Sequence, residues 1–240
     1  MIFPSKSFLI GEYLALAGGP SIVITHKPEF TQAKDPYNGA GGFGFSTAEF
    51  LFKHYTNQSL DEILKLYLGN PMHGDRTPSG FDLVAQVYGK PCVIRKSEKL
   101  EVSEFKIAQA PLMLFQASHL PNRKTKTYEH LRQVSIDEKW ATHARVLIED
   151  FIKTFESKEW HQAGALMNQF SESLRLENWV APEVQKERLE FLKLPGVLGV
   201  KGAGAMQTDA MWVMTDPTRP ESNETVMQIA LKLQLRPLSL

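Results

Sequence analysis

Near the amino terminus, apolar residues occur in short blocks, and the blocks are separated by residues typical of turns. The segment from Ser7 to Leu16 is rich in apolar residues, Gly18-Gly19-Pro20 interrupts the pattern, and a second apolar block covers 21–25. Blocks of this kind, bounded by Gly and Pro, are typical of a strand, a turn and a second strand. Residues 27–45 contain two prolines and end in a glycine-rich stretch. We therefore expect a loop over 27–45.

Helical patterns begin after this loop. Ser46 is the residue type that caps helices, and it predicts a helix from Thr47 toward Tyr55. Ser59-Leu60-Asp61-Glu62 has the spacing of a capping box and predicts a second helix. Farther along the chain, apolar spacing and turn residues predict further elements of both kinds. The expected helices are 79–88, 137–155, 160–176, 183–192 and 224–233, and the expected strands are 91–95, 110–116 and 211–214.

Composition narrows the class of protein. The 240 residues are 42% hydrophobic and 22% charged, with a formal net charge of zero, which is ordinary for a globular protein. A neutral chain lacks the basic footprint expected for nucleic acid or an anionic membrane. Its single cysteine, Cys92, excludes an internal disulfide and fits a reducing compartment. We find neither a secretory signal nor a membrane-spanning apolar run, and we expect a soluble, cytoplasmic protein.

The glycine-rich segment before Ser46 is the first candidate for chemistry. Glycines allow backbone N–H groups to approach a phosphate closely, and the N-terminus of a helix adds unpaired donors and a favourable dipole. Gly39, Gly41, Gly42 and Gly44 stand in that position. A surface turn explains the glycines equally well, so the segment alone leaves both interpretations open.

Four motifs, in order along the chain, together give a stronger signal. They are Pro4–Tyr13 (PSKSFLIGEY), Gly41–Ala48 (GGFGFSTA), Pro78–Asp82 (PSGFD) and Lys201–Ala205 (KGAGA). This set resembles the signature of the GHMP small-molecule kinases, most closely the mevalonate and phosphomevalonate kinases. The resemblance covers most of the chain. It implies an α+β fold of two domains, with an S5 domain 2-like part over 1–108 and a ferredoxin-like part over 109–240.

The resemblance also implies roles for individual residues. Lys6 would stabilise charge on the transferred phosphoryl group, and Asp82 would act as the catalytic base on the acceptor hydroxyl. The phosphate loop would bind ATP, and Ser46 would also be a ligand of Mg2+. The implied ATP-binding residues are Gly41, Gly42, Gly44, Ser46 and Thr47; the implied substrate-binding residues are Glu12, Tyr13, Ser79, Gly80, Lys124, Thr127, Gly204 and Ala205.

Each of these residues also has a plain structural interpretation. A lone lysine such as Lys6 is most often solvated, and an aspartate such as Asp82 in the first turn of a helix stabilises the helix dipole. The basic segment 123–127 has the composition of a solvated loop. The glycines of 201–209 fit a tight turn between a helix and a strand.

The chain also departs from the family pattern. Phe45 stands where the family loop has its first serine, and Met206 and Gln207 replace glycines of the last motif. Only about 30 residues separate the first two motifs, where the family usually inserts the strands of its adenine pocket. These departures favour an alternative: a catalytically impaired homologue that binds a small acidic metabolite or a protein partner.

The leading hypothesis is an ATP- and Mg2+-dependent kinase that phosphorylates mevalonate or phosphomevalonate in isoprenoid precursor synthesis. The expected ligand is a small-molecule alcohol or a phosphate-bearing acid, without nucleic acid or membrane as a partner, and a homodimer is left open. A common reacting centre requires a helix that starts within two or three residues of Ser46. It also requires Lys6 and Asp82 to face one cleft.

Overall fold

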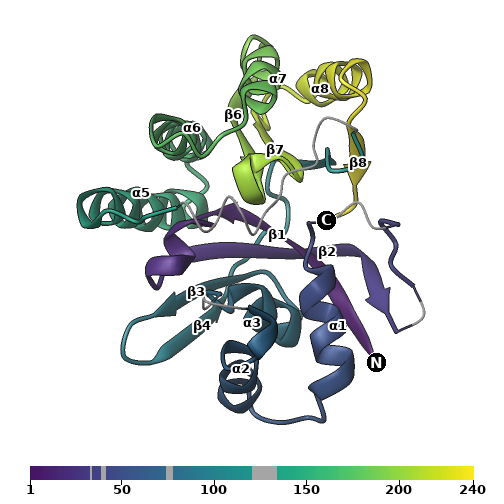
Figure 1. Ribbon diagram of the computed structural model, residues 1–240. Helices are drawn as coiled ribbons and strands as arrows, with labels where there is room; N and C mark the ends of the chain where they lie inside the picture. Colours follow the sequence, from purple (N-terminus) through teal and green to yellow (C-terminus); the bar gives the residue numbers. More distant parts are fainter. Residues whose placement is uncertain (33, 39–41, 74–77, 121–133) are drawn as a thin grey trace. The chain divides into compact units, whose positions relative to one another are not determined.

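The computed structural model describes residues 1–240 except 33, 39–41, 74–77 and 121–133 (Figure 1). The chain divides into two compact units, Met1–Lys106 and Ile107–Leu240. Each unit has its own antiparallel four-stranded sheet. The α+β class predicted from the sequence is confirmed.

The first unit is a sheet with helices packed on it. The strands lie in the order β1-β2-β3-β4, and every neighbouring pair is antiparallel. Helix α3 contacts β1, β2 and β3 and also both other α-helices, so it is the central helix of this layer. The elements are β1 (Ile2–Ile10), η1 (Leu14–Ala17), β2 (Ser21–Thr31), α1 (Phe45–His54), α2 (Leu60–Leu68), η2 (Pro71–His73), α3 (Phe81–Tyr88), β3 (Cys92–Lys96) and β4 (Leu100–Glu104).

The expected loop over 27–45 is wrong in its first part, because β2 continues to Thr31. Proline cannot donate to a sheet, so it is tolerated only at edges and bulges. Pro28 meets both conditions. The pairing of β1 with β2 shifts register between Phe3 and Ser5, opposite Pro28, and β3 pairs only with Ser21–Val23.

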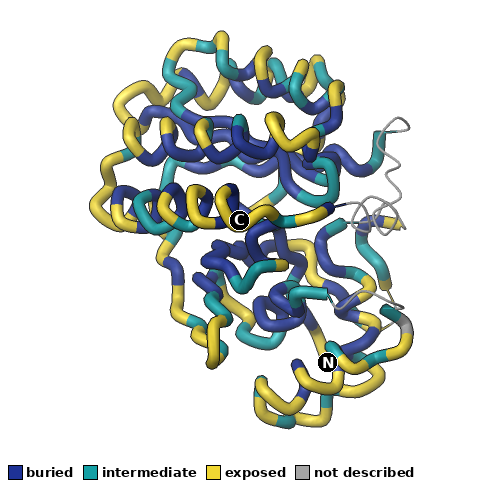
Figure 2. Tube along the Cα trace, turned by 60° about the vertical axis from the view of Figure 1, so that its left-hand side comes forward, coloured by how far each residue is buried: buried dark blue, intermediate teal, exposed yellow. Residues whose placement is uncertain are grey.

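The strands of the second unit are arranged β6-β7-β5-β8, as in a ferredoxin-like sheet. Three described helices, α5, α6 and α7, stand between β5 and β6, where the order β-α-β-β-α-β has one. Phe115, Val200, Val213 and Phe191 are fully buried in its core. Figure 2 shows that burial in both units follows the strands and the inward faces of the helices. The elements are β5 (Leu112–Gln116), α5 (Glu138–Glu156), α6 (Trp160–Leu176), α7 (Pro182–Leu192), β6 (Val197–Ala203), η4 (Ala205–Gln207), β7 (Ala210–Thr215), α8 (Glu221–Lys232) and β8 (Arg236–Leu238).

Residues 201–209 do not form a turn between a helix and a strand. Strand β6 leads directly into the loop, and β6 and β7 pair as neighbouring antiparallel strands. The sequence missed β6 because its residues, VLGVKGA, contain two glycines and a lysine, which weaken a strand pattern.

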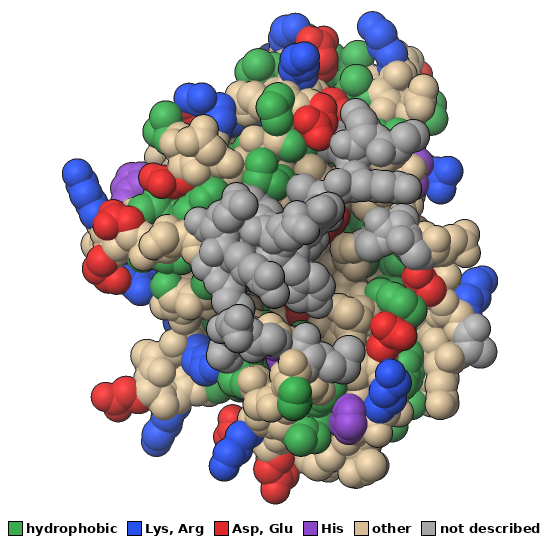
Figure 3. All heavy atoms as spheres, viewed as in Figure 1, with side chains coloured by type: hydrophobic (Ala, Val, Ile, Leu, Met, Phe, Trp, Pro, Cys, Tyr) green, Lys and Arg blue, Asp and Glu red, His purple; other side chains and the backbone are tan. Residues whose placement is uncertain are grey.

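The surface carries both signs of charge. Figure 3 shows Lys and Arg side chains interspersed with Asp and Glu on the face in view. This mixture agrees with the zero net charge of the sequence. Among the helices that the structure describes, none combines the length and the apolar character needed to cross a membrane.

Candidate functional site

Lys6 lies in the middle of β1 and is almost completely buried. Its ammonium group forms an ion pair with Asp82, with 2.8 Å between Nζ and Oδ1. The same nitrogen lies 5.2 Å from the centroid of the Phe8 ring, two residues along the strand on the same face. The backbone of β1 and the Phe8 ring therefore hold the Lys6 cation close to the Asp82 carboxylate.

Asp82 is in the first turn of α3, where a carboxylate interacts favourably with the helix dipole. The helix begins at Gly80, whose φ of 79° belongs to the left-handed region that glycine adopts without strain. A Cβ atom there would lie 2.4 Å from Leu64 Cδ1, so a side chain at this position would have to displace Leu64 as well as adopt a strained backbone. The Asp82 side chain remains 34% exposed, and its carboxylate can meet both Lys6 and a ligand from solvent.

The N-cap residue of helix α1 is also a glycine. Gly44 has φ 88° and provides no side-chain cap, so the first N–H groups of α1 have no capping side chain. A Cβ atom at Gly44 would lie 3.1 Å from Lys6 Cε and 3.0 Å from Gln86 Nε2. Just before it, the Phe43 carbonyl accepts a hydrogen bond of 3.0 Å from the Lys6 amide. The start of α1 is therefore in direct contact with the Lys6 side chain.

Gln86 of α3 connects this helix to β1 and to the start of α1. This residue was not identified from the sequence. This side chain, only 2% exposed, lies one helical turn after Asp82 on α3. Its Nε2 donates to the carbonyl oxygens of Pro4 at 2.9 Å and Gly44 at 3.2 Å. A polar residue on the apolar face of an eight-residue helix was the available signal.

Aromatic rings surround the glycine-rich loop. Phe43 is buried and stacks on Tyr37 with 4.4 Å between ring centroids, while the His26 ring meets Phe43 edge-on at 5.5 Å. Phe45 contacts Phe30 at 5.7 Å. These contacts give the loop an apolar support on the side of β2.

Burial shifts the pKa values of two side chains beside this loop, His26 and Tyr37. It lowers the pKa of His26 to about 4, and the nearby Lys6 charge acts in the same direction. Burial also raises the pKa of Tyr37 to about 12. Both side chains are therefore neutral near pH 7.

The other residues implied in ATP binding have different exposures. Ser46 is exposed in the first turn of α1, and Gly42 is half-buried just before the helix. Thr47 is buried, and its Oγ1 lies 3.4 Å from the hydroxyl of Tyr67. Helix α1 starts at Phe45, within the expected two or three residues of Ser46. The prediction that Ser46 caps the helix is wrong, because Gly44 is the N-cap and Ser46 lies inside the first turn. Gly41 lies outside the described residues.

The residues implied in substrate binding are distributed over both units. Ser79 Oγ accepts a hydrogen bond of 3.3 Å from the Phe81 amide, just before Asp82. Glu12 is half-buried and Tyr13 is buried at the turn after β1. Lys124 and Thr127 lie outside the described residues.

The loop after β6 folds back on itself in the second unit. Gly204 has φ 88°, and a Cβ atom there would overlap the carboxylate of Asp209. Lys201 is fully buried and donates to Gln207 Oε1 at 3.2 Å and to the carbonyl of Gly202. Ala205 begins the single 3-10 turn of this loop, η4.

No cluster of three or more His, Cys, Asp or Glu side chains that could hold a metal ion occurs within the described ranges. Mg2+ usually keeps several waters and takes phosphate oxygens beside one or two protein oxygens.

Comparison with solved structures identifies proteins that share this fold. No protein-family model matches the sequence, and no curated protein matches it at a significant level. Solved structures do match. L. major mevalonate kinase in complex with R-mevalonate has a TM-score of 0.72 at 13% identity, over 100% of this chain and 94% of that chain.

Two further solved structures are similar to this chain over nearly its whole length. Streptococcus pneumoniae phosphomevalonate kinase in complex with phosphomevalonate and AMPPNP has a TM-score of 0.74 at 10% identity, over 99% of this chain and 97% of that chain. Lactococcus lactis galactokinase complexed with galactose has a TM-score of 0.68 at 14% identity, over 100% and 93%. The chain therefore has the two-domain α+β fold of the GHMP kinases, as its four motifs predicted.

Proposed function

We propose that this protein is an ATP-dependent small-molecule kinase of the GHMP type, with mevalonate or phosphomevalonate as the acceptor. The observation that carries the proposal is the 2.8 Å pair between Lys6 Nζ and Asp82 Oδ1, next to the uncapped start of α1 at Gly44. A cation, a carboxylate and the N-terminus of a helix are groups that can hold phosphates and assist phosphoryl transfer. The acceptor is suggested by the mevalonate and phosphomevalonate kinases among the similar structures.

Asp82 is the proposed base. Its Oδ1 is paired with Lys6, and Oδ2 would accept the proton of the acceptor hydroxyl. The hydroxyl oxygen then forms a bond to the γ-phosphorus of ATP, while the bond from that phosphorus to the bridging oxygen breaks and ADP leaves. Lys6 stabilises negative charge on the transferred group, and the first N–H groups of α1 hold the phosphates.

Ser46 is the residue that would hold Mg2+, because its hydroxyl is exposed in the first turn of α1, beside the proposed phosphate position. An oxygen ligand of this kind fits the preference of Mg2+ for hard donors. When bound, the ion neutralises charge on the phosphates.

The aromatic packing of the loop favours a second candidate function. Phe43 is buried against Tyr37. Phe45, which occupies the position of the first serine in the family's phosphate loop, contacts Phe30. A phenylalanine side chain cannot donate a hydrogen bond to phosphate. On this basis the alternative is a noncatalytic homologue that binds a small acidic ligand beside Lys6 and does not transfer phosphate.

Calorimetry and an activity assay on the same preparation distinguish the two candidates. ATP is titrated with and without Mg2+, and R-mevalonate and phosphomevalonate are titrated separately. A coupled assay then measures ADP release with each acceptor, and galactose serves as the control acceptor. Binding of ATP with turnover of one acid supports the kinase. Binding of an acid without ATP binding supports the noncatalytic homologue, and binding of neither rejects both.

A further inference from the structure

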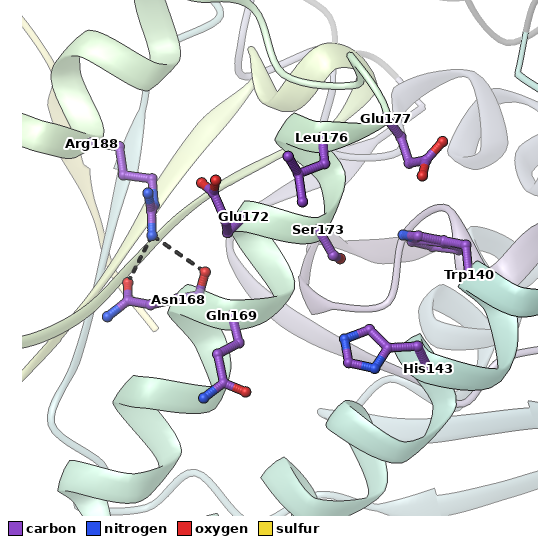
Figure 4. A pocket seen from close by; sticks show the side chains of 9 residues that line it. All are labelled: Trp140, His143, Asn168, Gln169, Glu172, Ser173, Leu176, Glu177 and Arg188. Atoms are coloured by element: carbon purple, nitrogen blue, oxygen red, sulfur yellow. Dashed lines mark hydrogen bonds between the residues drawn. The ribbon is translucent and has the colours of Figure 1, made fainter.

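The second unit contains a pocket of about 560 Å³, and none of the residues that line it belongs to the four motifs (Figure 4). Its walls come from α5, α6 and α7. Arg188 of α7 lies on one side and Trp140 of α5 on the other, with Glu172 of α6 between them. Leu176 and Glu177 at the end of α6 complete the rim. A volume of this size lies within the range of small-ligand sites.

Arg188 brings a buried cation to this pocket. The residue is only 5% exposed, and burial lowers its pKa. Its hydrogen bonds with described residues all go to neutral oxygens: Nε donates to Val200 O at 2.9 Å, and Nη2 donates to Asn168 Oδ1 at 3.2 Å and O at 3.4 Å. Buried charges are normally paired with opposite charges. The Glu172 carboxylate acts on this charge electrostatically without accepting a hydrogen bond from it. The guanidinium is therefore fixed in place at the wall of the pocket, where an anionic group of a ligand could pair with it.

Trp140 supplies a second donor. It is 7% exposed and packs edge-on against Trp179 at 4.8 Å. Its Nε1 is buried and has no hydrogen-bond partner in the part of the chain that the structure describes. A buried indole N–H normally finds an acceptor. An oxygen atom of a ligand in the pocket would be that acceptor.

Two carboxylates give the pocket its opposite charge. Arg175 binds Glu172 through Nε at 2.9 Å and Nη2 at 2.6 Å, and this pairing holds the pKa of Glu172 below its usual value. Glu177 is exposed at the carboxyl end of α6. Because each carboxylate oxygen has two lone pairs, Glu172 can still accept a hydrogen bond from a ligand.

The two buried donors and the two carboxylates together indicate which class of ligand the pocket can bind. A simple acid would satisfy Arg188 and Trp140 but would be repelled by the two glutamates. A simple amine would suit the glutamates but would leave the buried donors unpartnered. We propose that this pocket binds a small α-amino acid. Its carboxylate is directed to Arg188, its ammonium group to Glu172 and Glu177, and its side chain to Leu176 and Trp140, with an oxygen atom of the side chain as the acceptor for Trp140 Nε1. This proposal is independent of the proposed kinase activity.

Matched ligands provide the first test. The full chain is titrated calorimetrically with each of the common amino acids up to millimolar concentration. The strongest binder is then compared with its N-acetyl and carboxamide derivatives, each of which removes one charge. We expect saturable binding of at least one amino acid and a loss of about tenfold or more for either derivative. If no amino acid binds, or if both derivatives bind as well as the parent, the proposal is wrong.

Variants locate the binding in this pocket. Glu177→Gln changes an exposed side chain, so the protein should fold normally and bind the parent amino acid about tenfold more weakly. Glu156→Gln, at the exposed end of α5 and outside the pocket, is the matched control and should bind normally. Arg188→Lys should weaken the parent amino acid but not a ligand that lacks a carboxylate. Unchanged affinity in Glu177→Gln would overturn the proposed pocket even if Arg188→Lys failed to fold.

Discussion

Lys6 Nζ and Asp82 Oδ1 lie 2.8 Å apart, although the two residues belong to a strand and a helix that are distant in the sequence. The lysine is nearly buried, whereas the aspartate side chain is one-third exposed. One partner is therefore held by the sheet, and the other faces both the sheet and solvent. This asymmetry suits a pair in which the aspartate meets the substrate and the lysine stays fixed.

Asp82→Asn should abolish phosphoryl transfer and leave the fold nearly intact. The amide keeps the shape of the carboxylate and an oxygen for Lys6 but cannot accept the hydroxyl proton. We expect a stability loss of about 1 kcal/mol from the missing charge at the start of α3. A further loss of about 1–3 kcal/mol is expected because the nearly buried Lys6 loses its opposite charge. Thermal unfolding and the coupled assay on both proteins measure the two effects.

Asp61→Asn is the matched control, since Asp61 occupies the first turn of α2 in the same unit. It should lose only the helix-dipole part of the stability, about 1 kcal/mol, and no activity. Full activity in Asp82→Asn would remove Asp82 from the proposed chemistry.

Gln86→Leu should destabilise the first unit strongly. The substitution leaves the Pro4 carbonyl without its side-chain donor, whereas the Gly44 carbonyl keeps the hydrogen bond from the Ala48 amide. Denaturant unfolding should show a loss of about 1–3 kcal/mol, the cost of one unsatisfied buried group. Gln162→Leu, an exposed position on α6, should change stability little. A small loss in Gln86→Leu would mean that other contacts hold the strand, the loop and α3 together.

The noncatalytic alternative predicts that ATP binds to the natural sequence more weakly than the micromolar-to-millimolar range typical of enzymes, even with Mg2+. Phe45→Ser should improve this binding, because it restores a hydroxyl in the first turn of α1. It removes the contact with Phe30, which costs about 0.5–1.5 kcal/mol of stability. Calorimetry with Mg2+ and ATP tests both statements. Tight ATP binding by the natural sequence, with turnover, would contradict the first.

His26 should make the protein less stable in acid. Its pKa is 6.5 in the unfolded chain and about 4 when folded, so the unfolded state binds the proton more readily. The stabilisation is complete above pH 6.5 and is lost as the pH falls toward 4. This shift corresponds to about 3 kcal/mol.

His26→Gln should flatten the dependence of unfolding free energy on pH within this window. His54→Gln changes an exposed histidine on α1 and should leave the slope unchanged. Equal slopes in the natural protein and in His26→Gln would show that His26 is not the responsible group.

The sequence by itself determined the local structure around most candidate residues. Gly and Pro punctuation predicted the turn after β1, and the capping box at Ser59 predicted the start of α2, where both of its hydrogen bonds form. These features depend on residues close together in the chain, so local preference decides them. The motif order predicted the GHMP kinase fold that the similar structures share.

Only the tertiary structure decided which distant groups meet. Pro28 lies within β2 because a register shift with β1 accommodates it, and no local pattern announces that shift. Gln86 bonds to Pro4 and Gly44, and Arg188 to Val200 and Asn168, through contacts between separate elements. Packing of one element on another sets these distances, whereas sequence patterns report mainly the preferences of neighbouring residues.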